Sequence, residues 1–197
     1  MLRRLMSGAV ALAALATLTA CSDDGDTSSA APTSSAPAVD PSLRVPAPLN
    51  AERVSNDPCS VIAEADASAA GLASPGTVFQ TPAGIGCRWQ GSKYDTNKIF
   101  ISPLTSEHTG LSGIYANRAQ DKYFEPANIE GYPAVFAAQS DLRSHGTCVL
   151  WVAVTDELAV SVNSSILDGS SAGDPCPVVQ QVATAMIRNL EGAGAGA

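Results

Sequence analysis

Two histidines are the residues of this sequence best suited to catalysis, because histidine is the commonest general base in proteins. His145 follows Asp141 and Arg143 in a short polar stretch, where a carboxylate could orient its ring. His108 follows a glutamate in another polar stretch. Neither histidine accompanies a nucleophile motif, and we favour a polar surface position for both over a catalytic role. We therefore predict no catalytic residue.

Four cysteines organise the second part of the chain: Cys59, Cys87, Cys148 and Cys176. A zinc site would need closely spaced cysteine pairs, and none occur, so we predict disulfides and no metal site. Four cysteines allow three connectivities, which the sequence alone does not distinguish. We favour Cys59 with Cys87 and Cys148 with Cys176, because each pair would tie a helix start to a neighbouring strand. Phosphate- and dinucleotide-binding motifs are also absent, so no cofactor is expected.

The fifth cysteine, Cys21, ends a segment with the pattern of an export signal. Arg3 and Arg4 precede an apolar stretch that is too short to span a membrane. The sequence Leu-Thr-Ala-Cys at 18–21 resembles the lipobox of bacterial lipoproteins, in which the thiol receives a diacylglyceryl group. We expect a signal peptide over residues 1–20 and lipidation of Cys21, whose acyl chains, palmitate among them, would anchor the protein in the membrane. Lipidation also leaves an even number of cysteines.

An acidic tether rich in Ser, Thr, Ala and Pro is expected over residues 21–48. This composition buries too little apolar surface to fold, and as a disordered coil it would reach about 30 Å. A single globular domain over 49–191 and a disordered tail over 192–197 complete the predicted organisation. Loss of the two arginines of the signal peptide takes the net charge from −8 to −10, which excludes nucleic acid as a partner.

Hydrophobic patterns predict an α+β domain. Asp-Pro-Cys at 57–59 and at 174–176 predicts two helix starts, because Asp caps a helix and Pro fits its first turn. The strand at 148–154 is apolar on both faces and should be central. We expect an antiparallel sheet of five to seven strands, with helices packed mainly on one face. The other expected elements are strands at 76–80, 85–90, 98–104, 134–138 and 158–163 and a helix from Ser106 to about Ala119.

The lipobox, the paired Asp-Pro-Cys motifs, Cys87-x-Trp89 and Gly-Tyr-Pro-Ala-Val at 131–135 follow one another in a distinctive order. This order resembles the actinobacterial lipoprotein family called domain of unknown function 3558, over residues 49–191. The resemblance implies a cell-envelope lipoprotein without an established activity, so it transfers no functional residue. A likeness in fold to the Mog1/PsbP-like lipoproteins is an analogy, and a shared fold does not determine function.

These observations predict a non-catalytic binding module, anchored through its lipid at the extracytoplasmic face of the cell membrane. Its expected partner is an envelope protein, a wall polymer or a lipid. The alternatives are an envelope hydrolase with an unrecognised site, which requires a histidine in a cleft, and a purely structural envelope protein. An apolar pocket of several hundred cubic ångströms would favour a small ligand, and an exposed apolar patch would favour a protein partner.

Overall fold

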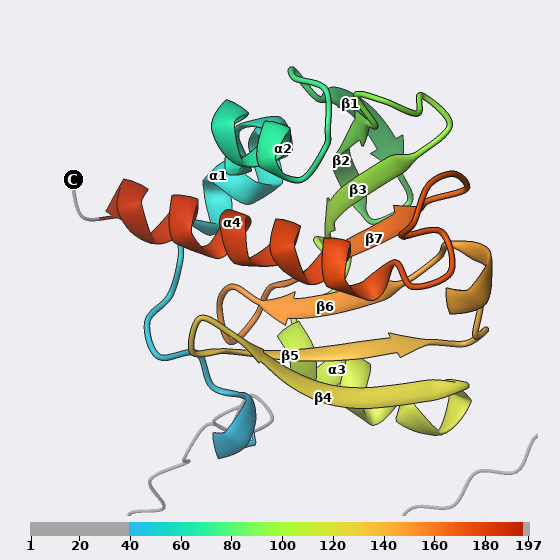
Figure 1. The fold of residues 1–197 in the computed structure, drawn as a ribbon. Coiled ribbons are helices and arrows are strands. Elements are labelled where there is room, and N and C mark those ends of the chain that lie inside the picture. The colour runs from blue at the N-terminus through green and yellow to red at the C-terminus, as the bar shows by residue number, and fades with distance from the viewer. Residues whose placement is uncertain (1–39, 195–197) are drawn as a thin grey trace, which may run out of the picture. The chain divides into compact units, whose positions relative to one another are not determined.

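The centre of the protein is a seven-stranded antiparallel sheet in a computed structural model that describes residues 40–194. The strand order is β1-β2-β3-β7-β6-β5-β4, as Figure 1 shows. The strands are β1 (Thr77–Thr81), β2 (Gly84–Gln90), β3 (Lys98–Pro103), β4 (Tyr123–Ile129), β5 (Tyr132–Ala138), β6 (Val149–Ala153) and β7 (Ala159–Ser165). Two meanders, β1–β3 and β4–β7, are joined by the pairing of β3 with β7. The predicted α+β fold is confirmed.

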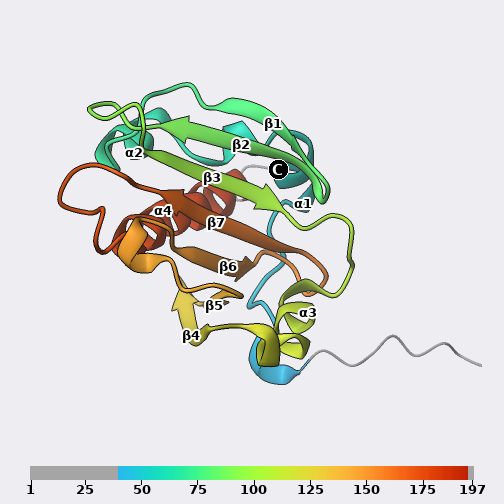
Figure 2. The same cartoon turned by 90° about the vertical axis from the view of Figure 1, so that its right-hand side faces the viewer.

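Helices cover the two faces of the sheet unequally. They are α1 (Ala51–Asn56), α2 (Glu64–Ala69), α3 (Gly110–Ala116) and α4 (Cys176–Gly194). α4 crosses one face over β6 and β7, with α1 and α2 beside it, whereas α3 packs against β6 on the opposite face. In the view of Figure 2, no helix of the described chain lies in front of β1, β2 and β3. Helices therefore pack mainly on one face, as predicted.

The main core lies between α4 and the sheet. Side chains alternate along β6, so Leu150 and Val152 face α4 while Trp151 and Ala153 face α3. β6 has strands on both sides and apolar contacts on both faces, which confirms that it is central. α4 contributes an apolar stripe whose six members are all buried: Val179, Val182, Ala183, Met186, Ile187 and Leu190.

Two disulfides attach helical segments to strands. Cys59 lies in a 3₁₀ turn (Pro58–Val61) and bonds to Cys87 of β2. Cys148 immediately precedes β6 and bonds to Cys176, the first residue of α4. This is the pairing favoured from the sequence. The helix start expected at the first Asp-Pro-Cys motif is only a 3₁₀ turn, and its aspartate side chain makes no capping hydrogen bond.

The folded part extends beyond the predicted domain boundaries at both ends. Leu43 is buried under α3, and the Val45 N–H donates to the Asp156 carboxylate at 3.0 Å. These contacts attach the last residues of the predicted tether to the domain. At the other end, α4 continues to Gly194, three residues into the predicted tail.

Several sequence predictions concern segments that the structure leaves out. The predicted signal peptide (1–20), Cys21 and the remainder of the predicted tether up to residue 39 lie outside the described residues. Residues 195–197 of the predicted tail do so as well. The signal peptide, the lipidation and the tether therefore stay predictions.

Two elements of the structure have no clear signal in the sequence. β4 contains Pro126, which argues against a strand because proline has no N–H for the ladder. The structure resolves this conflict by placing β4 at an edge of the sheet, where one row of donors is unused. α1 buries only Val54, so it lacks the repeated apolar spacing by which a helix is recognised.

α3 is shorter than predicted and begins at Gly110 instead of after Ser106. Gly110 has a φ of +52°, a left-handed conformation that interrupts a helix and favours glycine. A Cβ atom at this position would clash with the carbonyl oxygen of Asp156, in the turn between β6 and β7. The predicted end near Ala119 falls in a separate 3₁₀ turn (Arg118–Gln120). The close approach to Asp156 therefore fixes where α3 starts.

We predict that replacing both Cys148 and Cys176 with serine lowers the free energy of unfolding by about 3.6 kcal/mol, the chain-entropy value for a separation of 28 residues. The Cys59–Cys87 bond spans the same separation, so its double serine variant should lose a similar amount. Urea unfolding followed by circular dichroism measures both losses. Unchanged unfolding midpoints would contradict the bracing role of the disulfides.

Candidate functional site

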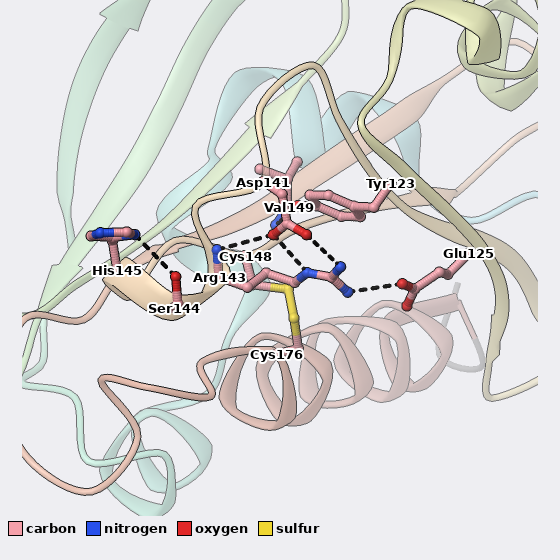
Figure 3. Close-up of polar contacts among 9 residues, drawn as sticks. All are labelled: Tyr123, Glu125, Asp141, Arg143, Ser144, His145, Cys148, Val149 and Cys176. Carbon is pink, nitrogen blue, oxygen red and sulfur yellow. Dashed lines mark hydrogen bonds and ion pairs between the residues drawn. A yellow bond between two sulfur atoms is a disulfide. The ribbon is translucent and has the colours of Figure 1, made fainter.

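The loop between β5 and β6 contains the charged residues that the sequence singled out for chemistry, and Figure 3 shows their arrangement. The Arg143 guanidinium donates to the Asp141 carboxylate through Nε at 2.9 Å and Nη2 at 2.7 Å. Its Nη1 donates to Glu125 of β4 at 2.8 Å. The guanidinium carbon lies 4.2 Å from the centre of the Tyr123 ring, also on β4. We call these four residues the Arg143 clamp.

The Arg143 clamp attaches the loop to the edge of the sheet. Its members already engage the hydroxyl and carboxylate groups that a catalytic site would need. The Tyr123 hydroxyl accepts a hydrogen bond from the N–H of Val149 at 3.2 Å, and burial raises the pKa of Tyr123. Hydrogen bonds from Arg143 lower the pKa of Asp141 to about 2. At neutral pH the Asp141 carboxylate is therefore ionised and engaged by Arg143, which makes it a poor proton acceptor.

Neither histidine lies in a catalytic arrangement. The His145 side chain is exposed, and its Nδ1 lies 3.1 Å from the hydroxyl of Ser144. Figure 3 shows it apart from Asp141, whose carboxylate faces Arg143. His108 is exposed in the segment before α3. The hydrolase alternative requires a histidine in a cleft, and neither histidine lines the two hollows described below.

The cysteines do not supply a reactive site either. All four cysteines of the domain are in disulfides and so carry no thiolate. Within residues 40–194, no group of three or more His, Cys, Asp or Glu side chains is placed to hold a metal ion. In the same range, no helix combines the length and apolarity that crossing a membrane requires.

A groove of about 510 Å³ lies between α3 and the sheet, on the face opposite α4. Trp151 and Val149 of β6 contribute to its floor from the same face of their strand. The other apolar lining residues are Ala137 and Ala138 at the end of β5, Ile114 of α3, and Leu104. We call this hollow the α3 groove. Its volume lies in the range of small-molecule sites, which are about 300–1,000 Å³.

Trp151 is the most distinctive side chain of the α3 groove. It is one of two tryptophans, and the other, Trp89, is 1% exposed and packs near the Cys59–Cys87 disulfide. Trp151 is only partly buried, although β5 and β7 hold its backbone on both sides. A partly open indole on a rigid strand provides a surface on which a ring of a ligand can stack.

The rim of the α3 groove is polar and has no basic side chain among its lining residues. The Asn117 amide donates to the Gly113 carbonyl at 3.0 Å and accepts from Gln120 at 3.2 Å, so these amides are held in place. The groove therefore suits a neutral or positively charged ligand that combines an apolar face with hydrogen-bonding groups. The polar rim side chains are two carboxylates and three amides: Glu107, Asp121, Asn117, Gln120 and Gln139.

Sequence reasoning missed the α3 groove. The pattern of β6 assigns Trp151 to the core, because both faces of the strand are apolar. A helix of only seven residues covers the face with Trp151, so part of that face stays open. The signal that could have indicated the groove is the pair Gly110 and Gly113, which shortens the helix and removes two side chains from it.

We predict that Arg143→Gln raises the pKa of Asp141 from about 2 toward 3.8, because the hydrogen bonds from the guanidinium are lost. The folded-state pKa is depressed, so the interaction stabilises the fold above a pH of about 4, and its contribution disappears as the pH falls to about 2. The wild type should therefore lose more stability than the variant across this window. Carbon-detected NMR titration of the carboxyl group gives the pKa, with Ser144→Ala as the control. A value still near 2 in the Arg143 variant would mean that another group depresses it.

Comparison with protein families finds a match between residues 16–189 and the model described as "Protein of unknown function (DUF3558)". Searches of curated proteins and of solved structures find no match. The likeness in fold to the Mog1/PsbP-like lipoproteins therefore stays a prediction. The matched region contains the whole sheet and both disulfides. Because the match covers most of the chain, and as the order of its motifs predicted, this protein belongs to the DUF3558 family.

Proposed function

We propose that this protein is an extracytoplasmic lipoprotein, anchored in the membrane through acyl chains on Cys21, whose domain is a non-catalytic binding module of the cell envelope. The two disulfides support an extracytoplasmic location, because such bonds persist in oxidising compartments. The lipobox-like sequence at 18–21 supports the anchor. Two acyl chains hold a protein on a membrane stably, whereas one is marginal.

The partly open indole of Trp151 on the floor of the α3 groove is the observation that carries the binding role. We infer that the ligand is a neutral sugar unit of a wall polymer. A pyranose ring has a face of C–H groups, which can stack on an indole, and hydroxyl groups around its edge. Amides and carboxylates such as those of Gln139 and Asp121 can donate to and accept from these hydroxyls.

The charge of the rim distinguishes this ligand from the other partner classes. Glu107 and Asp121 would repel an anionic lipid headgroup, and no basic side chain of the groove would compensate. A bare acyl chain would fill the floor of the groove. It would leave the rim amides that it covers without hydrogen-bond partners from the ligand, which costs free energy. A neutral sugar satisfies both parts of the groove.

We predict that Cys21→Ser releases the protein from the membrane, because the variant has no thiol to acylate. In the cell that produces the protein, the wild type should incorporate radiolabelled palmitate and enter the detergent phase of Triton X-114. The variant should lose both properties. Ser22→Ala is the matched control, since it alters the neighbouring residue and leaves the thiol. Palmitate found on the Cys21 variant would contradict the assigned anchor.

We predict that chitotetraose, a neutral N-acetylglucosamine oligomer, binds the full chain and changes the fluorescence of Trp151, while buried Trp89 stays unaffected. Trp151→Ala should weaken binding by about tenfold, because a central aromatic contact contributes more than about 1 kcal/mol. Trp151→Phe keeps an aromatic ring and should retain most of the affinity. Titration calorimetry measures binding in the variants.

The controls for this experiment separate a sugar from an apolar ligand. Val78→Ala removes a side chain that is 52% exposed on β1, away from the α3 groove, and should not change binding. A neutral apolar probe, N-phenyl-1-naphthylamine, should not compete with chitotetraose. Competition by this probe, or equal affinities of the wild type and Trp151→Ala, would refute the sugar assignment.

A further inference from the structure

We propose that a second hollow, at the junction of β3 and β7, binds a small phosphate ester through Lys93 and Lys98. The hollow has a volume of about 220 Å³ and lies between the β2–β3 loop and the loop from β7 to α4, which adjoin each other in Figure 2. Ser170 and Ser171 contribute hydroxyl groups to its rim. We call it the lysine pocket. It shares no lining residue with the α3 groove.

The distribution of lysine is the first observation behind this site. The chain has a net charge of −8 and only three lysines, and two of the three line this one hollow. The ion pairs found within residues 40–194 are made by Arg143 and Arg188, so neither lysine is neutralised by a carboxylate within 4 Å there. The ammonium of Lys93 lies 5.0 Å from the centre of the Tyr94 ring.

The walls of the lysine pocket are held by hydrogen bonds between distant parts of the chain. The Asn97 side-chain oxygen accepts the N–H groups of Leu167 and Asp168 at 2.9 and 3.0 Å, and its nitrogen donates to the Asp168 carbonyl at 2.9 Å. The Thr96 hydroxyl donates to the Asp168 carboxylate at 2.6 Å. The two loops are therefore fixed before a ligand arrives, which reduces the entropy lost on binding.

Asp168 is the one acidic residue that lines the lysine pocket. Its carboxylate is engaged by Thr96 at 2.6 Å and makes no ion pair with either lysine. The lining groups thus carry two positive charges and one negative charge, in a protein that is otherwise acidic. The net positive charge of the lining groups therefore favours an anion, although the net charge of the whole protein does not.

The side chains of the lysine pocket favour phosphate over other anions. Lysine binds phosphate as a point charge, whereas carboxylates are most often matched by the planar fork of arginine, which is absent from the lining. The floor is apolar and closed by Leu72, Ile99 and Ile166, all less than 10% exposed. This combination fits a phosphate group attached to a short organic part. A free metabolite and a phospholipid headgroup share this chemistry.

Titration calorimetry of the full chain in a neutral detergent tests the site. Glycerol 3-phosphate represents a free phosphate ester, and dihexanoyl phosphatidylglycerol represents a lipid headgroup. The double variant Lys93→Gln/Lys98→Gln should weaken binding by more than about tenfold, because hydrogen bonds from charged groups contribute about 1.5–3 kcal/mol each. Lys122→Gln is the matched control: it removes the third lysine, which is exposed and just before β4.

Each outcome of the titration decides a specific point. Binding of either probe that is lost in the double variant and kept in Lys122→Gln supports the site, and the probe that binds identifies the source of the phosphate. Absence of binding by the wild type, or an equal loss in Lys122→Gln, overturns it. Trp151→Ala should leave phosphate binding unchanged, so failure of this site and failure of the α3 groove are distinguishable.

Discussion

Burial of the apolar stripe of α4 against the sheet is the interaction on which the rest of the structure depends. Each large side chain of the stripe, such as Met186 or Leu190, contributes about 1.5–3 kcal/mol when removed from water. The Cys148–Cys176 disulfide attaches the first residue of this helix to the chain entering β6, so α4 crosses the sheet from a fixed point. This packing covers the face of the sheet over β6 and β7.

The two hollows differ in the charge of the side chains that line them. The α3 groove lies on the opposite face, where a helix of seven residues is too short to cover Trp151. The lysine pocket lies between loops that Asn97 holds together. Acidic and amide groups surround the first hollow, and two lysines that make no ion pair within residues 40–194 line the second. One acidic domain thus has two hollows that differ in the sign of their charged side chains, which are carboxylates in the first and mainly lysines in the second.

The sequence predicts the parts of this fold that depend on local patterns. Alternation identifies most strands, and the two Asp-Pro-Cys motifs place cysteines beside the strands to which they bond. β4 is missed because Pro126 opposes a strand unless the strand is known to lie at an edge, and edge position is a property of the whole sheet. Both hollows are missed for a related reason: each combines segments far apart in sequence, as Asn97 and Asp168 illustrate. Asp141, Arg143 and His145 do not form the catalytic arrangement considered from the sequence, because Arg143 binds the Asp141 carboxylate that His145 would need.

The pairing of β3 with β7 forms the seam between the two meanders, and it has a consequence for folding. Each meander contains only hairpins between strands that are neighbours in the sequence, and each is joined to a helical segment by its own disulfide. The seam pairs Lys98–Pro103 with residues 160–165 and is the single strand pairing in the described sheet between distant parts of the sequence. Long-range pairing of this kind slows folding, because much chain entropy is lost before its contacts are gained. The lysine pocket lies across this seam, so it exists only in a chain in which the two meanders have paired.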